Sequence, residues 1–248
     1  MSVDQFVNGE QRVTSVIERG AALDWTGIVS ALDHHGCATT GPLLTADACA
    51  GLIDAYESEG LFRKRVVMAQ HGYGRGEYQY FAYPLPPLIA ALRVALYSPL
   101  AAVANKWNKA MKVDVRYPPD HDAFRARCHE AGQVKPTPLL LRYGPDDFNC
   151  LHQDLYGEHV FPLQVAILLS EPGKDFSGGE FVLTEQRPRM QSRVDVVPLQ
   201  RGEGVIFPVY QRPVQGTRGI YRVNLRHGVS RVRSGERFTA GIIFHDAK

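Results

Sequence analysis

The chain has 248 residues, 44% of them apolar and 22% charged, with a formal net charge of +2, which predicts a soluble globular protein with a substantial core. No apolar run approaches the roughly 20 residues of a membrane helix, and no basic region followed by an apolar stretch begins the chain, so neither a membrane partner nor a signal peptide is expected. The four cysteines form no CxxC pair, which argues against a zinc knuckle or a disulfide scaffold and favours a reduced, cytoplasmic protein.

The sequence up to residue 138 predicts mostly helices. Residues 1–20 are polar without clear periodicity and predict a short helix or a loosely docked arm. Apolar residues at helical spacing over 24–32, and Thr45 as an N-cap before 46–58, predict two more helices. The stretch 88–111 also has a helical pattern, which Pro99 is expected to divide into two helices. Residues 112–138 are rich in proline and charge and predict a loop, with or without a short helix at 120–131.

Residues 62–83 differ from this background because they combine aromatic and basic side chains. They predict two strands joined by a glycine-rich turn. Aromatic faces beside cations can stack bases and hold phosphates, which makes Arg75, Tyr78 and Tyr80 candidate substrate contacts. Packing of the rings into the core is the alternative, and the sequence alone leaves both open. The rings and cations of the segment are Tyr73, Tyr78, Tyr80, Phe81, Tyr83, Arg63, Lys64, Arg65 and Arg75.

From residue 139 onward the pattern changes to short apolar strands separated by turn residues. Because no strand–helix alternation is present, the expected fold class is α+β, with a double-stranded β-helix (jelly roll) buttressed by N-terminal helices. We expect residues 1–138 to form a mainly helical part packed on a catalytic core of residues 139–248, within one compact domain. The predicted strands lie near 139–143, 150–155, 161–169, 179–184, 194–197, 203–208, 221–227 and 237–244.

The charges are distributed unevenly along the chain. Residues 1–60 contain nine acidic and two basic residues, whereas residues 187–237 contain eleven arginines, no lysine and three acidic residues. Such an arginine-rich segment is a candidate binding surface for phosphate or another anion. Arginines at alternate strand positions can equally well face water, and charge alone does not decide between the two.

Three residues have the composition of a metal site. His152 and Asp154 lie two positions apart on a predicted strand, so their side chains are expected on the same face. His227, at the end of another predicted strand, is placed to supply a third ligand. Two histidines and a carboxylate that leave positions open are the facial triad of non-haem Fe(II) oxygenases. The HxD pattern alone is weak, so its context has to support it.

That context includes a candidate anion clamp on the last strand. Arg237 stands ten residues after His227, and Thr239 follows two positions later on the same strand face. A guanidinium can pair through two hydrogen bonds with a carboxylate, and the threonine hydroxyl adds a donor. This pair would suit the distal carboxylate of 2-oxoglutarate.

These motifs resemble those of the Fe(II)/2-oxoglutarate dioxygenase superfamily over roughly residues 139–246. The stretch LLRYGP at 140–145, followed by LHQD at 151–154, is similar to the AlkB-type nucleic-acid demethylases. SGGEF at 177–181, and the basic residue ten positions after His227, look more like prolyl 4-hydroxylases. The whole chain is similar to a bacterial oxygenase family whose presumed task is demethylation of damaged bases.

The resemblance implies roles for individual residues. His152, Asp154 and His227 match the iron ligands, Arg237 with Thr239 matches the 2-oxoglutarate clamp, and Tyr143 matches a tyrosine that bonds the cosubstrate. Two features depart from the demethylases. Leu141 stands where they have an asparagine, and their cosubstrate arginine lies further from the distal histidine.

Three functions follow from this resemblance. The first is oxidative demethylation of damaged bases in DNA or RNA, with 2-oxoglutarate and O2 as cosubstrates and succinate as a product. The second is hydroxylation of a protein side chain, as in prolyl 4-hydroxylases, and the third is a non-catalytic jelly-roll binding module. The sequence predicts neither the choice between DNA and RNA nor the oligomeric state.

Overall fold

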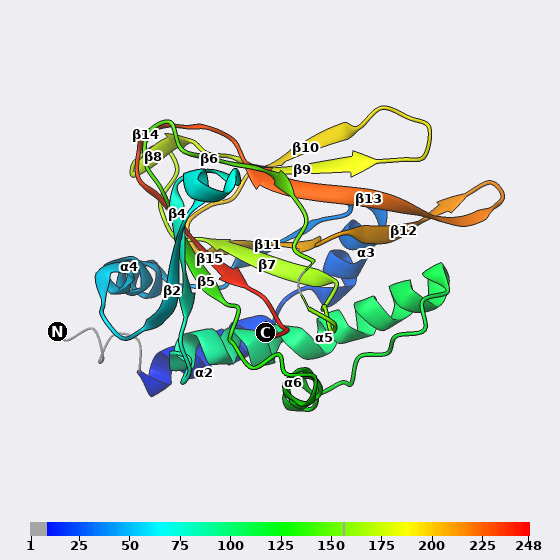
Figure 1. Cartoon of the computed structure of the whole chain (residues 1–248), viewed down its shortest axis with the longest axis horizontal. Helices are drawn as coiled ribbons and strands as arrows, with labels where there is room; N and C mark the ends of the chain where they lie inside the picture. Colours follow the sequence, from blue (N-terminus) through cyan, green and yellow to red (C-terminus); the bar gives the residue numbers. More distant parts are fainter. Residues whose placement is uncertain (1–8, 156) are drawn as a thin grey trace.

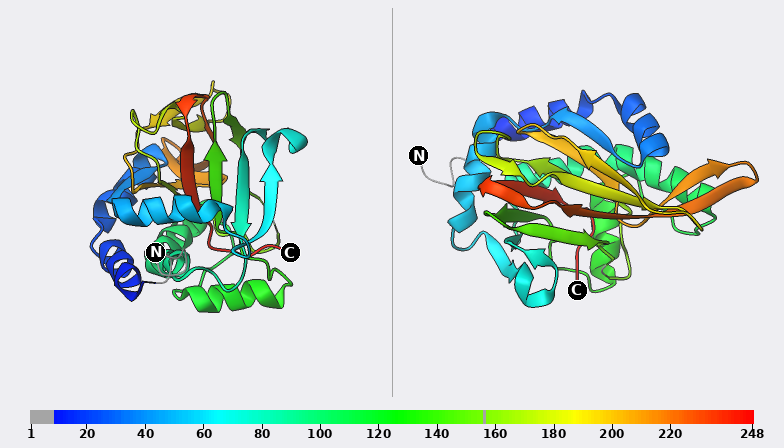
Figure 2. Two further views of the ribbon diagram at one scale, coloured as in Figure 1. Left: turned by 90° about the vertical axis from the view of Figure 1, so that its left-hand side faces the viewer. Right: turned by 90° about the horizontal axis from the view of Figure 1, so that it is seen from above.

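The computed structural model describes residues 9–155 and 157–248 and contains two large antiparallel sheets, a two-stranded sheet of β14 and β8, and helices packed on one side (Figure 1). The larger sheet has the strand order β1-β11-β7-β15-β5-β4-β2, and the smaller has the order β10-β9-β13-β6-β3, with β12 paired to β13. The α+β class and the jelly roll expected from the sequence are confirmed. Figure 2 shows the helices gathered on one side of the strands.

The helices form because their apolar residues repeat at helical spacing and their ends are capped. Thr45 accepts a hydrogen bond from the backbone of Ala48, which confirms it as an N-cap, and Asp24 caps the preceding helix through Gly27. The first helix, residues 10–21, lies almost wholly in the range 1–20 that was expected to hold a helix or an arm. Residues 1–8 lie outside the described residues. The helices are α2 (Glu10–Ala21), α3 (Trp25–His35), α4 (Ala46–Asp54), α5 (Pro87–Met111) and α6 (His121–Glu130), with short 3-10 turns at η1 (Ala55–Glu57) and η2 (Met68–His71).

Helix α5 corrects one expectation, because it continues through Pro99 without dividing. Proline removes one backbone hydrogen bond, but buried side chains on both sides of it, such as Tyr97 and Leu100, hold the helix in the core. Among the described helices, α5 alone is long and apolar enough to cross a membrane, which the sequence analysis did not anticipate. Of its most apolar window, 61% is buried inside the fold, as expected for a core helix.

The strands agree with the predicted positions at all eight places, and 139–143 and 203–208 agree to the residue. Three further strands in this half, β8, β12 and β14, were not expected. The strands are β1 (Ala38–Pro42), β2 (Phe62–Val67), β3 (Gly74–Arg75), β4 (Glu77–Phe81), β5 (Leu139–Tyr143), β6 (Phe148–His152), β7 (Leu163–Leu168), β8 (Phe176–Gly178), β9 (Phe181–Gln186), β10 (Arg193–Val197), β11 (Glu203–Pro208), β12 (Gln211–Gly216), β13 (Gly219–Val229), β14 (Val232–Gly235) and β15 (Arg237–Ile242).

Both sheets take strands from both halves of the sequence. β1 pairs with β11, β4 extends the larger sheet beyond β5, and β3 pairs with β6. Alternation along the larger sheet places Leu140 and Ala240 among the residues buried against the helices. Their neighbours Leu139, Leu141 and Thr239 therefore point to the opposite side, where they line a cavity.

Candidate metal centre

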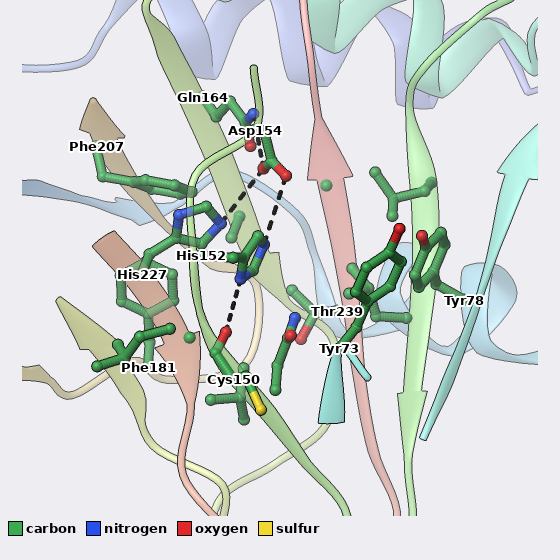
Figure 3. A pocket seen from close by; sticks show the side chains of 18 of the residues that line it. Tyr73, Tyr78, Cys150, His152, Asp154, Gln164, Phe181, Phe207, His227 and Thr239 are labelled. Atoms are coloured by element: carbon green, nitrogen blue, oxygen red, sulfur yellow. Dashed lines mark hydrogen bonds and ion pairs between the residues drawn. The ribbon is translucent and has the colours of Figure 1, made fainter. Parts of the chain in front are cut away.

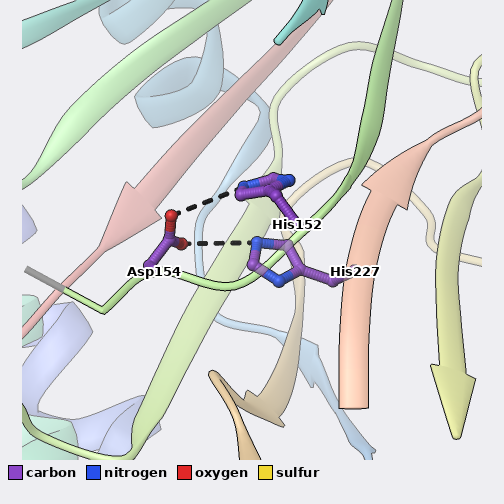
Figure 4. Close-up of side chains that lie close together, drawn as sticks. All are labelled: His152, Asp154 and His227. Carbon is purple, nitrogen blue, oxygen red and sulfur yellow. Dashed lines mark ion pairs between the residues drawn. The ribbon is translucent and has the colours of Figure 1, made fainter. Parts of the chain in front are cut away.

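His152, Asp154 and His227 converge in the space between the two sheets (Figure 4). His152 ends β6, and His227 is its direct register partner on β13. The two carboxylate oxygens of Asp154 each lie 3.4 Å from one Nε2 atom, Oδ1 from that of His152 and Oδ2 from that of His227. One ligand atom from each residue lies within 4.8 Å of the others, which is close enough to share one ion.

The position of Asp154 differs from the expected one. β6 ends at His152, so Asp154 lies in the following loop rather than on a strand face. Hydrogen bonds replace the strand as its support: Gln164 donates from Nε2 to Asp154 Oδ2 at 3.0 Å, and Gln153 donates from Nε2 to the carbonyl of Leu225 at 2.7 Å. These side chains hold the carboxylate against the histidines, as outer hydrogen bonds commonly do at metal sites.

Each histidine presents Nε2 to the shared space. His152 Nδ1 lies 2.8 Å from the carbonyl oxygen of Cys150, so that nitrogen carries the proton and Nε2 is left with a lone pair. His227 is buried, and its ring packs against Phe207 and Phe181, at centroid distances of 4.6 and 6.1 Å. Its Nδ1 has no hydrogen-bond partner among the described residues.

Electrostatics favour the protonation states that a metal needs at His227 and Asp154, but not at His152. Burial lowers the pKa of His227, which keeps its imidazole neutral. Burial alone would raise the pKa of Asp154, but hydrogen bonding to the two histidines outweighs it and holds that pKa well below its usual range. For His152, hydrogen bonding to Asp154 outweighs the opposing effect of burial and raises the pKa.

The donor set fits a divalent first-row transition metal. Two neutral imidazole nitrogens and one ionised carboxylate, converging from one side, are the ligands that non-haem Fe(II) uses. The other side faces a cavity of about 360 Å³, whose walls come from both sheets (Figure 3). A bound ion would therefore keep access to small molecules in that cavity.

Arg237 lies deep in the same cavity. Its guanidinium is 2% exposed and donates from Nη1 to Thr239 Oγ1 at 2.5 Å, while Nε has no partner among the described residues. Burial lowers the pKa of Arg237 to about 10, so the group remains charged at neutral pH. No carboxylate of the described chain lies within ion-pair distance of it. A buried cation without a counter-ion fits a site for a carboxylate ligand.

The backbone leaves room for this arginine at Gly179. A Cβ atom at that position would lie 2.8 Å from Arg237 Cδ and 2.9 Å from Val232 Cγ2. The glycine also has a φ of +63°, a conformation that side chains disfavour. The absence of a side chain at Gly179 therefore leaves the space that the stem of Arg237 occupies.

Tyr143 occupies the wall beside Arg237, where it faces Arg237 in register across β5 and β15. It is fully buried, which raises the pKa of its hydroxyl to about 12. Asn149 donates from Nδ2 to the Tyr143 hydroxyl oxygen at 3.3 Å. Asn149 was not among the predicted site residues, because nothing in the local sequence pattern relates it to Tyr143.

Of the three candidate substrate contacts, Tyr78 and Tyr80 line the cavity and Arg75 does not. Arg75 lies on β3, outside the cavity, with its Nε 3.8 Å from Asp147 Oδ1. Tyr73, from the turn that precedes β3, also lines the cavity, although it was not among the three candidate substrate contacts. It is 44% exposed. Figure 3 shows the rings of Tyr73 and Tyr78 side by side.

The arginine-rich segment does not form one uninterrupted cationic surface. Several of its arginines are paired with carboxylates, and Arg212 is 1% exposed and bound to Glu185 inside the fold. Arg237 lies in the cavity. The other ion pairs are Arg187 with Glu185, Arg193 with Asp195, Arg201 with Glu171 and Arg231 with Asp146.

Comparison with known sequences places these residues in a family. Residues 76–247 match the model of a family of oxygenases described as catalysing oxidative methylation of damaged DNA. Two uncharacterized proteins from two strains of Mycobacterium tuberculosis are each 45% identical over 195 residues, which cover 77% of this chain and 84% of each relative.

Solved structures show the same fold at low identity. A prolyl hydroxylase from Trichoplax adhaerens, in complex with a peptide fragment of the hypoxia inducible factor oxygen degradation domain, has a TM-score of 0.55 at 13% identity, covering 98% of this chain and 96% of that one. An oxidoreductase of the 2OG-Fe(II) oxygenase family from Burkholderia pseudomallei has a TM-score of 0.52 at 18% identity, covering 90% and 92%. At these identities the likeness establishes the jelly-roll fold.

Proposed function

The chain belongs to the oxygenase family whose model spans residues 76–247, and we propose that it is an Fe(II)- and 2-oxoglutarate-dependent dioxygenase that oxidatively demethylates damaged nucleic-acid bases. The observation that carries this proposal is one cavity that holds the His152, Asp154 and His227 triad together with the buried cation of Arg237, which has no counter-ion among the described residues. Because an oxygenase oxidises C–H bonds, the DNA chemistry of the family corresponds here to oxidation of a methyl group already on the base.

Fe(II) and 2-oxoglutarate, when bound, supply oxidation of a substrate C–H bond by O2 coupled to decarboxylation of 2-oxoglutarate. In the overall reaction an N-methyl group, O2 and 2-oxoglutarate give an N-hydroxymethyl group, succinate and CO2. One oxygen atom enters the substrate and the other enters succinate. The hydroxymethyl group then breaks its N–C bond, releases formaldehyde and leaves N–H on the base.

The residues of the chain bind and orient these partners. His152, Asp154 and His227 would hold the ion through two Nε2 atoms and a carboxylate oxygen. The Arg237 guanidinium and the Thr239 hydroxyl would bind the distal carboxylate of 2-oxoglutarate. The hydroxyl of Tyr143, which remains protonated at neutral pH, can donate a further hydrogen bond to the cosubstrate.

The cavity wall suits a flat, partly apolar group. Phe181 and Phe207 pack against His227 and shield it from water, while Tyr73, Tyr78 and Tyr80 line another part of the wall. Aromatic rings stack on bases whatever their sequence. A base in a duplex has to leave the stack before its methyl group can reach such a cavity.

Hydroxylation of a protein side chain remains the second candidate, supported by the ten-residue spacing from His227 to Arg237. The third hypothesis, a non-catalytic binding module, is not retained because the chain belongs to a family of oxygenases. Localisation in the cytoplasm remains part of the proposal.

The test is to incubate the purified protein with Fe(II), 2-oxoglutarate and oligonucleotides that carry N-methylated bases. Formaldehyde and unmodified base should form together with succinate, and the Asp154→Ala variant should form none of them. His35→Ala, which removes an exposed histidine at the end of α3, serves as the matched control and should keep full activity.

A parallel reaction with proline-containing peptides separates the two candidates. Addition of one oxygen atom to a peptide, with no repaired base on any oligonucleotide, would support the protein hydroxylase and contradict demethylation. Failure to consume 2-oxoglutarate in the presence of every substrate would contradict both.

A further inference from the structure

A second cavity, of about 500 Å³, adjoins the metal centre on the side of β2 and β4. The two cavities share Tyr73, Tyr78 and Tyr80 in their walls, and both reach Asp154. The shared tyrosines therefore stand at the boundary between them. A ligand that places one group beside the metal centre can extend past these rings into the second cavity.

Strand register sets the order of residues along this path. Lys64 pairs with Tyr80 across β2 and β4, Tyr80 with Leu139 across β4 and β5, and Leu139 with Gly241 across β5 and β15. Register partners lie on the same face of a sheet, so this row forms a continuous floor. Neighbouring strands are about 4.8 Å apart, which places Lys64 about 14 Å from the strand that carries Arg237.

The far end of this floor is basic. Arg63, Lys64, His71 and Lys248 line the second cavity, and Asp154 is the only acidic side chain among the described residues that line it. Arg63 is already engaged, because its guanidinium lies 4.5 Å from the centre of the Tyr80 ring and its Nε donates to the carbonyl of Pro136 at 2.8 Å. Lys64 is exposed, and no carboxylate of the described residues lies within ion-pair distance of it.

We propose that the second cavity is a phosphate subsite, in which Lys64 binds the backbone phosphate of the nucleotide whose base reaches the metal centre. This proposal rests on the proposed function and names the contact that would distinguish a nucleotide in a strand from a free base. Along the floor the tyrosine rings come first and the cation of Lys64 comes next. In a nucleotide an aromatic base is likewise followed by an anionic phosphate, so the two sequences of groups correspond. An acidic peptide offers the anion but not the flat group.

The experiment compares a short single strand carrying one N-methylated base with the corresponding methylated nucleoside, which lacks phosphate. Lys64→Ala should raise the KM of the strand about fivefold to tenfold and leave the KM of the nucleoside unchanged, as expected for the loss of one phosphate contact. The slope of the logarithm of the strand's binding constant against the logarithm of salt concentration should become shallower by about one, as expected for the loss of one phosphate contact. Lys64→Arg should restore both quantities.

Lys109→Ala is the matched control, because it removes an exposed lysine from the last turn of α5 and should change neither quantity. Strand affinity is also measured by fluorescence anisotropy without turnover. Lys64-dependent binding of the strand without oxidation would preserve the subsite and contradict demethylation. Oxidation of strand and nucleoside that is equally insensitive to Lys64→Ala would overturn the subsite alone. Tighter Lys64-dependent binding of an acidic peptide than of the strand would also overturn it.

Discussion

His152 and His227 are direct register partners across β6 and β13, and the centroids of their rings lie 4.2 Å apart. Two imidazoles held this close by a sheet form a preorganised half-site that needs Asp154 alone to complete it. The fold therefore positions the ligands before a metal arrives, and metal binding should appear as added stability of an already folded protein.

Metal addition should raise the melting temperature. At a free Mn(II) or Fe(II) concentration about 100 times its Kd, stabilisation of about 3 kcal/mol is expected, or about 5–10 °C for a domain of this size. His152→Ala should abolish this shift while His35→Ala retains it, as measured by differential scanning calorimetry. A metal-dependent shift that is unchanged in His152→Ala would contradict the assignment of this ligand.

Replacing Arg237 should stabilise the fold and at the same time weaken the binding of 2-oxoglutarate. Arg237→Met removes a buried cation that has no counter-ion in the described chain, so we expect the free energy of unfolding without ligands to rise by about 1–3 kcal/mol. The same variant should lose the stabilisation that 2-oxoglutarate gives to the metal-loaded protein. Urea denaturation with and without 2-oxoglutarate measures both effects, and unchanged cosubstrate stabilisation would contradict the clamp.

Gly179→Ala should weaken 2-oxoglutarate binding by displacing Arg237, whose Cδ lies 2.8 Å from the added Cβ. Gly173→Ala is the matched control, because Gly173 has a φ of +79° but open space around it. Both changes should destabilise the fold by about 1–2 kcal/mol through backbone strain. A raised KM for 2-oxoglutarate is expected in Gly179→Ala alone, and an equal change in both would show that strain is the cause.

Acid should destabilise the fold between pH 6.5 and 4 through His121. Burial lowers the pKa of His121 to about 4, whereas the unfolded value is about 6.5, so the unfolded state binds more protons in this range. The stability contributed by the neutral form is present above pH 6.5 and lost as the pH falls toward 4, by about 3 kcal/mol.

His121→Gln removes this titration and keeps a side-chain donor for the carbonyl of Phe244. The plot of unfolding free energy against pH, from urea denaturation, should be flatter for the variant between pH 6.5 and 4. Identical slopes for variant and wild type would place the acid sensitivity elsewhere.

The buried ion pair of Arg212 and Glu185 should be important for stability. Arg212 also donates to the carbonyls of Asp33 and His34 at the end of α3, so its loss leaves several buried polar groups unpaired. We expect Arg212→Ala to lower the free energy of unfolding by about 3–5 kcal/mol. Arg187→Ala removes the partly exposed partner of the same carboxylate and should change the free energy of unfolding by less than about 1 kcal/mol. Equal effects in urea denaturation would contradict this difference.

Much of the fold could be predicted because buried strands have a strong apolar signal. The segments 139–143 and 203–208 are apolar and bounded by turn residues, and both match the structure. β12 was missed because it is polar and contains Pro213, and only its pairing with β13 makes it a strand. Pro99 was misjudged because burial of the surrounding helix outweighs the local preference of proline.

The candidate site was predictable where residue type and spacing carry chemistry, as for the triad and Arg237. Its supporting residues were not predictable, because Gln164 and Asn149 matter only through the tertiary neighbours that they contact. Arg75 was assigned to the substrate path with Tyr78, but it belongs to β3, which pairs with β6 in the other sheet. Arg75 and Tyr78 are close in sequence, and nothing in the sequence indicates that they belong to different sheets.

The floor that runs from β15 through β5 and β4 to β2 holds its two ends at a fixed distance from each other. Its interstrand hydrogen bonds set the spacing between the cosubstrate clamp and Lys64, so neither end can slide to suit a longer or shorter ligand. A part of the cavity wall that can adapt to lesions of different size is therefore the turn around Tyr73, which lies between Gly72 and Gly74, both with positive φ. Substitutions in this turn should therefore alter lesion preference more readily than substitutions in the floor.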